Sequence, residues 1–292
     1  MAKTQKETVS LLSDGEALVK AARQTGFGME WEVSSVFHDA KFQTKKNTRS
    51  PITSTKDLED ISPRPEIDVM AYKASETDGS IYLAECKGAE SNSVLMLFET
   101  DLTYGHFPRI YFHPKKVILN YQKEFISDKT NGPFYCYSGD FFNCTVKDGG
   151  FNYSLANSQN NKFFRGVTQL TEAIDSYHRF HYESIHSLLF KGPWLVTPLI
   201  ITNARLVVAR YCPDKVILTE PEIVEVPWAI YENPLVYGDK TNLGTKAWET
   251  EKELPQERRI PYCVVVQKNS LKSLLATPWG FEYKGLPLNY LS

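Results

Sequence analysis

Two neighbouring stretches indicate the fold of this chain: Pro65-Glu66-Ile67-Asp68-Val69-Met70-Ala71-Tyr72 and Ile81-Tyr82-Leu83-Ala84-Glu85-Cys86-Lys87-Gly88. Both are rich in β-branched, aromatic and other apolar residues, as is typical of β-strands. The residues between them, 74–80, are mostly turn formers. The pattern therefore predicts a β-hairpin.

The register of this hairpin places charged residues opposite one another. If the turn is centred on residues 76 and 77, paired residues have numbers that sum to 153, so Asp68 faces Glu85 and Glu66 faces Lys87. Opposed residues have Cβ atoms about 5 Å apart, and Lys87 points to the same face as Glu85. Since crowded carboxylates are costly unless a cation neutralises them, the pattern favours a divalent metal. The alternative is a surface hairpin with a Glu66–Lys87 ion pair, worth about 0.2–1 kcal/mol.

These residues carry a family resemblance. Glu66-Ile67-Asp68 followed by Glu85-Cys86-Lys87 resembles the motif of the PD-(D/E)XK nuclease superfamily, with Ile67 where the motif has a leading Pro. More distantly, the chain resembles the Mrr-type restriction-endonuclease branch. The resemblance covers residues 28–88 well and 165–210 loosely. It implies an α/β fold of the restriction-endonuclease-like kind, with a central mixed β-sheet flanked by helices.

The resemblance also implies roles for the residues that match the motif. Asp68 and Glu85 would bind Mg²⁺, for which Mn²⁺ would substitute, and the backbone carbonyl of Cys86 would supply another oxygen. Lys87 would orient or help to deprotonate the attacking water. Gln169, from a later helix, would position Lys87 or that water.

Two predicted helices carry the remaining site candidates. Residues 28–40 have helical spacing on an inward face that consists of Met29, Val33, Val36 and Ala40. Glu32 falls on the same face, and the resemblance implies that a Glu from this helix completes the metal site. Glu30, on the neighbouring face, is the alternative, and the periodicity favours Glu32. A second helix is expected from Arg165 to Phe180, with Gln169 beside its buried stripe.

A basic segment leads toward the hairpin and consists of Lys41, Lys45, Lys46 and Arg49. We expect it to contact nucleic-acid phosphates, which gives affinity without sequence choice. The alternative is an ordinary solvated face. Residues 43–64 are polar and bounded by proline, which predicts a loop or short edge structure. The net charge of −2 does not by itself indicate a nucleic-acid-binding protein.

The domain organisation follows from length and pattern. With 292 residues, one large domain or two small ones are expected, and we favour a single nuclease-like domain over 1–292. Its core is expected over about 8–88 and 162–292. A long insertion with its own short strands is expected over about 89–161.

The second half of the chain predicts further strands of the same sheet. Apolar runs predict a buried strand over 194–203 and another over 204–210. Residues 213–258, with several prolines, are expected to be an irregular surface excursion. A strand over 260–266 and a short helix capped by Asn269 or Ser270 are expected to close the sheet.

Cellular location is predicted from what the chain lacks. No apolar window approaches the length of a membrane span, and the first residues have no signal-peptide core. The five cysteines are scattered and odd in number, which favours reduced thiols. A cytoplasmic protein without a membrane partner is therefore expected.

Together these features predict a Mg²⁺-dependent endonuclease that hydrolyses phosphodiester bonds, with DNA as the expected substrate and RNA as the alternative. A role in restriction or anti-phage defence, as a homodimer or in a larger defence complex, would fit the resemblance. Two alternatives stay open. One is a catalytically silent nuclease-like subunit for nucleic-acid binding or assembly. The other is a metal-dependent nucleotide phosphohydrolase.

Overall fold

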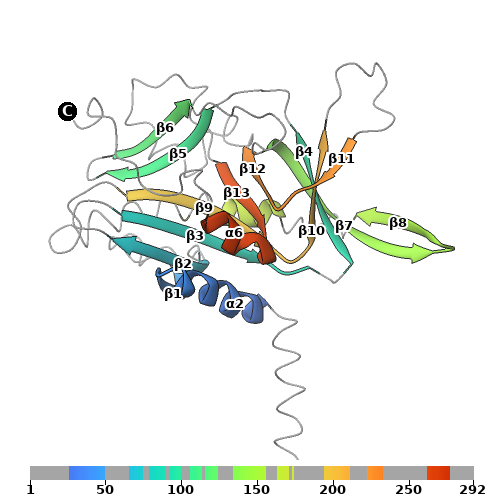
Figure 1. The fold of residues 1–292 in the computed structure, drawn as a ribbon, viewed down its shortest axis with the longest axis horizontal. Helices are drawn as coiled ribbons and strands as arrows, with labels where there is room; N and C mark the ends of the chain where they lie inside the picture. Colours follow the sequence, from blue (N-terminus) through green and yellow to red (C-terminus); the bar gives the residue numbers. More distant parts are fainter. Residues whose placement is uncertain are drawn as a thin grey trace, which may run out of the picture.

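The computed structural model describes residues 26–49, 66–74, 79–89, 92–99, 106–113, 116–123, 134–155, 163–170, 173, 194–210, 222–232 and 262–276. Over these residues the protein is α/β, with one mixed sheet of 13 strands and few helices (Figure 1). The helix expected within residues 8–25 lies outside the described residues. In the described ranges, no helix is long and apolar enough to span a membrane.

The predicted hairpin is present. Strands β2 (Glu66–Ala74) and β3 (Gly79–Lys87) are antiparallel, and the numbers of their paired residues sum to 153 throughout, which confirms the expected register. This ladder ends at Val69 and Ala84, one step before Asp68 and Glu85.

Two strands flank the hairpin. Strand β1 (Gln43–Arg49) pairs antiparallel with β2 and forms one end of the strand order, so the expected edge structure before the hairpin is a strand. Strand β9 (Trp194–Thr202) lies parallel to β3 on its other side. The hairpin thus forms the centre of a four-stranded part of the sheet.

Helices cover the two faces of this part of the sheet. Helix α2 (Gly26–Asp39) confirms the predicted helix and packs its Phe37 ring against Tyr82 of β3. Residues 163–170 are helical and lie on the other face, where Gly166 contacts the side chain of Lys87. Because successive side chains of a strand point to opposite faces, even-numbered Tyr82 and odd-numbered Lys87 belong to different layers.

Strand β9 connects several parts of the sheet. Besides β3, it pairs with β13 (Tyr262–Gln267) and β5 (His106–His113), and all of its residues are buried. A continuous apolar run is typical of a strand that is covered on both faces. After β13 come η4 (Lys268–Ser270) and α6 (Leu271–Leu275), as expected for the closing strand and short helix.

The segment expected as an insertion carries strands that join the same sheet. They are β5 and four others: β4 (Ser93–Glu99), β6 (Lys116–Lys123), β7 (Tyr135–Lys147) and β8 (Gly150–Leu155). Strand β5 pairs with β9, β4 pairs with β10 (Arg205–Arg210), and β7 pairs with β12. These strands therefore extend the sheet rather than forming a separate layer.

The expectation of an irregular excursion over 213–258 was wrong where the structure describes this segment. Strand β11 (Glu222–Glu225) pairs with β10, and β12 (Trp228–Glu232) lies inside the sheet between β13 and β7. The intervening Pro227 flanks both strands instead of interrupting either, so it removes no hydrogen bond from a ladder. The apolar centre of β12 is fully buried and consists of Ala229, Ile230 and Tyr231.

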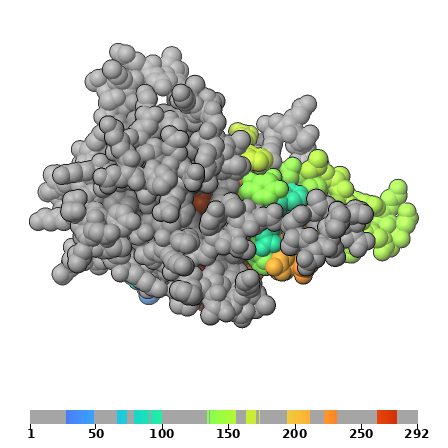
Figure 2. Space-filling model, turned by 90° about the horizontal axis from the view of Figure 1, so that it is seen from above, coloured from blue at the N-terminus to red at the C-terminus, as the bar shows by residue number. Residues whose placement is uncertain are grey.

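The β7–β8 hairpin projects from one end of the molecule (Figures 1 and 2). Every residue of β8 is exposed. The large exposed apolar side chains here include Val146, Phe151, Tyr153 and Leu155. The described cysteines, Cys86, Cys136, Cys144 and Cys263, are free thiols.

Candidate active site

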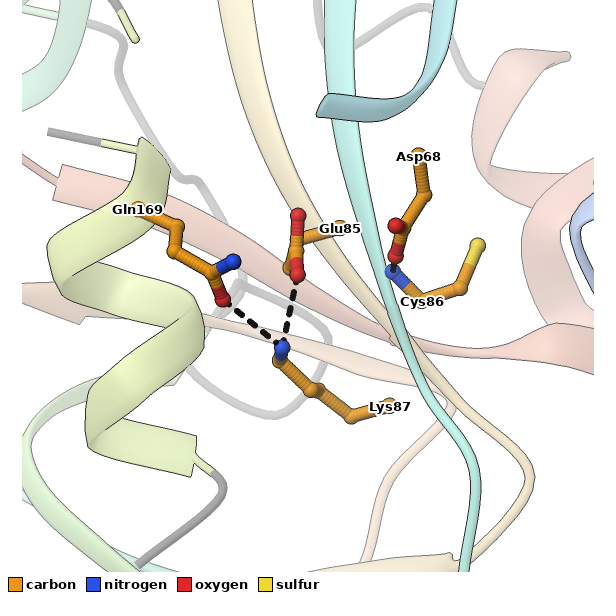
Figure 3. A network of polar contacts seen from close by, with 5 residues as sticks. All are labelled: Asp68, Glu85, Cys86, Lys87 and Gln169. Carbon is orange, nitrogen blue, oxygen red and sulfur yellow. Dashed lines mark hydrogen bonds and ion pairs between the residues drawn. The ribbon is translucent and has the colours of Figure 1, made fainter. Parts of the chain in front are cut away.

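The centre of the site is the side chain of Lys87. Its Nζ donates to Glu85 Oε1 at 2.6 Å and to Gln169 Oε1 at 3.0 Å (Figure 3). Glu85 is only 2% exposed, so this ion pair is largely shielded from water. Three of the predicted site residues therefore meet, although Gln169 comes from a helix 82 residues further along the chain.

Asp68 lies on the other side of β3 from Gln169. Its Oδ2 accepts a hydrogen bond of 2.7 Å from the backbone N–H of Cys86 (Figure 3). In an extended strand, the N–H and C=O of one residue point to the same edge, so the Cys86 carbonyl also points toward the strand of Asp68. This is the oxygen that the resemblance assigns to a metal.

The thiol of Cys86 differs from its backbone groups in its chemistry. Burial, followed by the charges of Asp68, Glu30 and Glu85, raises the pKa of this thiol well above its ordinary value. The thiol is therefore protonated at neutral pH, and a hard cation such as Mg²⁺ prefers the carbonyl oxygen of this residue to its sulfur.

The predicted orientation of α2 was wrong in one respect that matters for the site. Glu32 is on the surface: its side chain is 53% exposed and pairs with Lys268. Glu30 is 6% exposed, and the negative charge of Asp68 acts on it. The carboxylate from α2 that reaches the site is thus Glu30, the alternative that the sequence did not favour.

The error has a clear physical cause. Phe37 is fully buried, whereas Val36 is only partly buried. Because consecutive residues are about 100° apart around a helix, choosing Val36 in place of Phe37 turns the inward face away from Glu30. The observed inward face consists of Met29, Glu30, Val33, Ser34 and Phe37.

Asn47 is a site residue that sequence reasoning missed. It lies opposite Asp68, between the recorded pairs of β1 with β2, and its side chain is hydrogen-bonded to Glu30. Its φ of 48° is in the left-handed region, which Asn tolerates better than most residues. An Asn within a strand is unfavourable, and this was the only signal in the sequence.

The carboxylates of the site hold their protons more tightly than usual. Burial is the main cause for each of Glu30, Asp68 and Glu85, and the charges of neighbouring carboxylates add to it. The pKa of Glu85 rises to about 7, even though Lys87 opposes the change. The pKa values of Glu30 and Asp68 are raised as well, which indicates a site with excess negative charge.

The residue types at this site fit a hard divalent cation. Glu30 Oε2 and Glu85 Oε2 are buried and have no hydrogen-bond partner. Unpaired buried carboxylate oxygens are costly, and Mg²⁺ prefers such oxygen ligands. In the described part of the chain, however, no group of three or more His, Cys, Asp or Glu side chains has the arrangement of a formed metal site. Binding an ion would therefore require side-chain movement.

The predicted basic segment lies along the edge strand beside the site. Lys41 and Lys45 are exposed, and Lys46 is partly buried with its ammonium over the Trp31 ring. The backbone of Arg49 pairs with β2, and its side chain lies outside the described residues. The structure thus places these residues next to the strand of the first acidic motif.

Comparisons with models of protein families, with curated proteins and with solved structures found no match for this chain. A function therefore has to be inferred from the residues of the site.

Proposed function

We propose that the protein is a metal-dependent nuclease of the PD-(D/E)XK type that hydrolyses phosphodiester bonds, with DNA as its main substrate. The observation that carries the proposal is that buried Glu85, which Lys87 contacts together with Gln169, also lies within range of the charges of partly buried Asp68 and buried Glu30. Excess acid can hold a divalent cation, and this cation and the ammonium would both stabilise negative charge that develops on a phosphate.

Four groups would hold the divalent cation: the carboxylates of Glu30, Asp68 and Glu85, and the backbone carbonyl of Cys86. When bound, the cation would polarise the scissile phosphate and lower the pKa of a water molecule. The two carboxylate oxygens that have no partner, on Glu30 and Glu85, are the strongest support for this assignment.

Lys87 acts on the phosphate and the water. Its ammonium, held by Glu85 and Gln169, would stabilise the negative charge that grows on the phosphoryl oxygens and orient the attacking water. Gln169 accepts a hydrogen bond from Lys87 and so limits the rotation of this flexible side chain. Since it acts through Lys87, Gln169 is a positioning residue.

The basic residues of β1 would bind the phosphates on either side of the scissile bond. Lys45 is exposed, and Lys45 Nζ also lies over the Tyr72 ring of β2, so the two neighbouring strands share this surface. Contacts of this kind give affinity that does not depend on base sequence and that falls with salt.

The test is a cleavage assay on plasmid, linear and single-stranded DNA, RNA and mononucleotides with Mg²⁺ or Mn²⁺. Asp68→Ala and Lys87→Ala are the inactive variants, and Glu32→Gln is the matched control from the exposed side of α2. We expect cleavage by the wild type and the control, and loss of about 100-fold or more in each inactive variant. EDTA should also abolish cleavage by the wild type.

A catalytically silent nucleic-acid-binding subunit is the second candidate. The observation that favours it is the direct contact of Lys87 with Glu85 Oε1, because this contact already neutralises one would-be ligand. In the same assay, nucleic-acid binding without turnover would support this candidate. Turnover of mononucleotides alone would instead indicate a phosphohydrolase.

A cytoplasmic location and a role in restriction or anti-phage defence belong to the same proposal. Their support is the family resemblance and the free state of the four described cysteines. A homodimer would suit cleavage of both strands of a duplex.

A further inference from the structure

Trp31 is unusually exposed for its size. Tryptophan side chains are highly buried on average, yet 66% of Trp31 is accessible to solvent. It follows Glu30 directly on α2, so the Cα atoms of the two residues are about 3.8 Å apart. An open indole ring therefore lies at the border of the carboxylate cluster.

A positive charge accompanies this ring. Lys46 Nζ lies over the face of Trp31, and the next residue on β1, Asn47, is hydrogen-bonded to Glu30. The two elements thus meet twice, once through the aromatic–cation pair and once through the Asn47–Glu30 pair. The aromatic–cation pair is one residue away from the site on both elements.

We propose that Trp31 and Lys46 form a subsite for an unpaired nucleotide next to the scissile phosphate. The base stacks on the face of the indole that Lys46 does not cover, and the ammonium binds the adjoining phosphate. This inference rests on the proposed function and adds its substrate class, single-stranded or unpaired nucleic acid. In a paired duplex the bases are already stacked on each other, so no base face is free to stack on the indole.

Further lysines lie near this edge of the sheet. Lys41 is exposed just before β1, and Lys45 is exposed on the face of β1 that points away from α2, since its neighbours Thr44 and Lys46 contact α2. Glu32, the acidic residue next to Trp31, turns to the other side of the helix and pairs with Lys268. A strand of nucleic acid that enters along β1 therefore meets cations before it reaches the buried carboxylates.

The chain offers matched controls for this subsite. Phe151 is exposed to the same extent as Trp31, 66%, but lies on the projecting β7–β8 hairpin. Lys147 is an exposed lysine on the same hairpin. Neither residue belongs to the site.

The experiment measures fluorescence anisotropy of labelled 12-nucleotide DNA, RNA of the same sequence, and the DNA duplex, in EDTA so that no cleavage occurs. Trp31→Ala should weaken single-strand binding about 5- to 100-fold, because stacking on an aromatic side chain has this effect. Trp31→Phe should restore part of the affinity. Duplex affinity should change less than twofold. Comparison of the DNA and RNA strands shows which unpaired nucleotide is preferred.

Lys46→Gln should lower the slope of log affinity against log salt by about 0.7, as expected for one phosphate contact on a single strand. Phe151→Ala and Lys147→Gln should leave affinity and slope unchanged. Circular dichroism and urea unfolding of each variant check that the fold is retained. Equal loss for single strand and duplex, or no loss in Trp31→Ala, would overturn the subsite.

The binding assay separates this inference from the nuclease proposal. If the wild type cleaves nucleic acid but Trp31→Ala binds normally, only the subsite is wrong. If Trp31-dependent binding occurs and no substrate is cleaved, the nuclease proposal fails and the subsite stands. A wild type that binds no nucleic acid contradicts both.

Discussion

Glu30 and Glu32 are two residues apart on α2, yet they lie in opposite environments. Glu30 is buried, close enough to Asp68 for their charges to repel, whereas Glu32 is half-exposed and paired with Lys268. Their chemistry is identical, so the difference comes entirely from the direction in which the helix presents each side chain. This pair therefore provides a matched test of the metal site.

We expect Mg²⁺ to raise the unfolding midpoint of the wild type at pH 8, because a ligand that binds only the folded state stabilises it, by about 2.7 kcal/mol at 100 times its Kd. Glu30→Gln should weaken Mg²⁺ binding about tenfold or more, and Glu32→Gln should bind it like the wild type. Thermal unfolding over a Mg²⁺ titration measures both effects. Equal responses of the two variants would show that Glu30 is not a ligand.

The raised pKa of Glu85 predicts how stability depends on pH in EDTA. Its pKa is about 7 in the folded protein against an ordinary value of 4.5, so the folded state holds the extra proton between these values. Stability from this group is present below pH 4.5 and is lost as pH rises through 7. From pH 5 to pH 8, the wild type should lose about 2 to 3 kcal/mol more than Glu85→Gln.

Urea unfolding of both proteins at several pH values measures this difference. The glutamine cannot ionise, so its curve supplies the baseline for all other titrating groups. Parallel pH dependences of the two proteins would mean that Glu85 titrates normally.

At the scale of elements, the site depends on how closely the helix over 163–170 approaches β3. A Cβ added to Gly166 would lie 2.6 Å from Lys87 Cε and 3.5 Å from Glu85 Cγ. The first distance is too short, so a Cβ at this position would force the end of the Lys87 side chain to move. The helix fixes the lysine both by this contact and by the hydrogen bond from Lys87 to Gln169.

Gly166→Ala should therefore displace the end of Lys87 and lower kcat at least tenfold, since small shifts in a reacting group are costly. The free energy of unfolding should change by no more than about 1 kcal/mol, because alanine favours the helix by a similar amount. Steady-state kinetics and urea unfolding measure the two effects. Gly88→Ala is the control, since its added Cβ meets nothing within 4 Å.

At the scale of the molecule, β9 is the strand that connects the site hairpin with other parts of the sheet. It pairs with β3 of the site, with β13 and with β5, and its residues are buried on both faces. A substitution that removes packing in β9 therefore destabilises contacts on both faces of the sheet. The site strand β3 has β9 as one of its two neighbours, so it depends on the same core.

Leu199→Ala should lower the free energy of unfolding by 2–5 kcal/mol, the usual cost of a cavity at a fully buried leucine. Ile223→Ala, at a side chain that is 54% exposed on β11, should cost less than about 0.5 kcal/mol. Urea unfolding followed by circular dichroism compares them. Similar losses in both variants would contradict the central position of β9.

Local patterns predicted the hairpin and its register, because strand alternation and a short turn fix the pairing within about twenty residues. They also predicted α2, β9, β10 and β13. The place of β12 inside the sheet was missed because prolines flank this segment in the sequence, and proline is also typical of loops. The pairing of strands from residues 89–161 with β9, β10 and β12 was also missed, because it joins segments far apart in the sequence.

The sequence by itself determined that Asp68, Glu85 and Lys87 share one hairpin, because period-two alternation and the turn leave no other register that buries the apolar residues. Only the tertiary structure decided which glutamate of α2 turns inward, since the rotation of the helix is set by the packing of Phe37 against Tyr82. It also decided that Gln169 meets Lys87, because this contact depends on a distant helix packing over β3 without a side chain at Gly166.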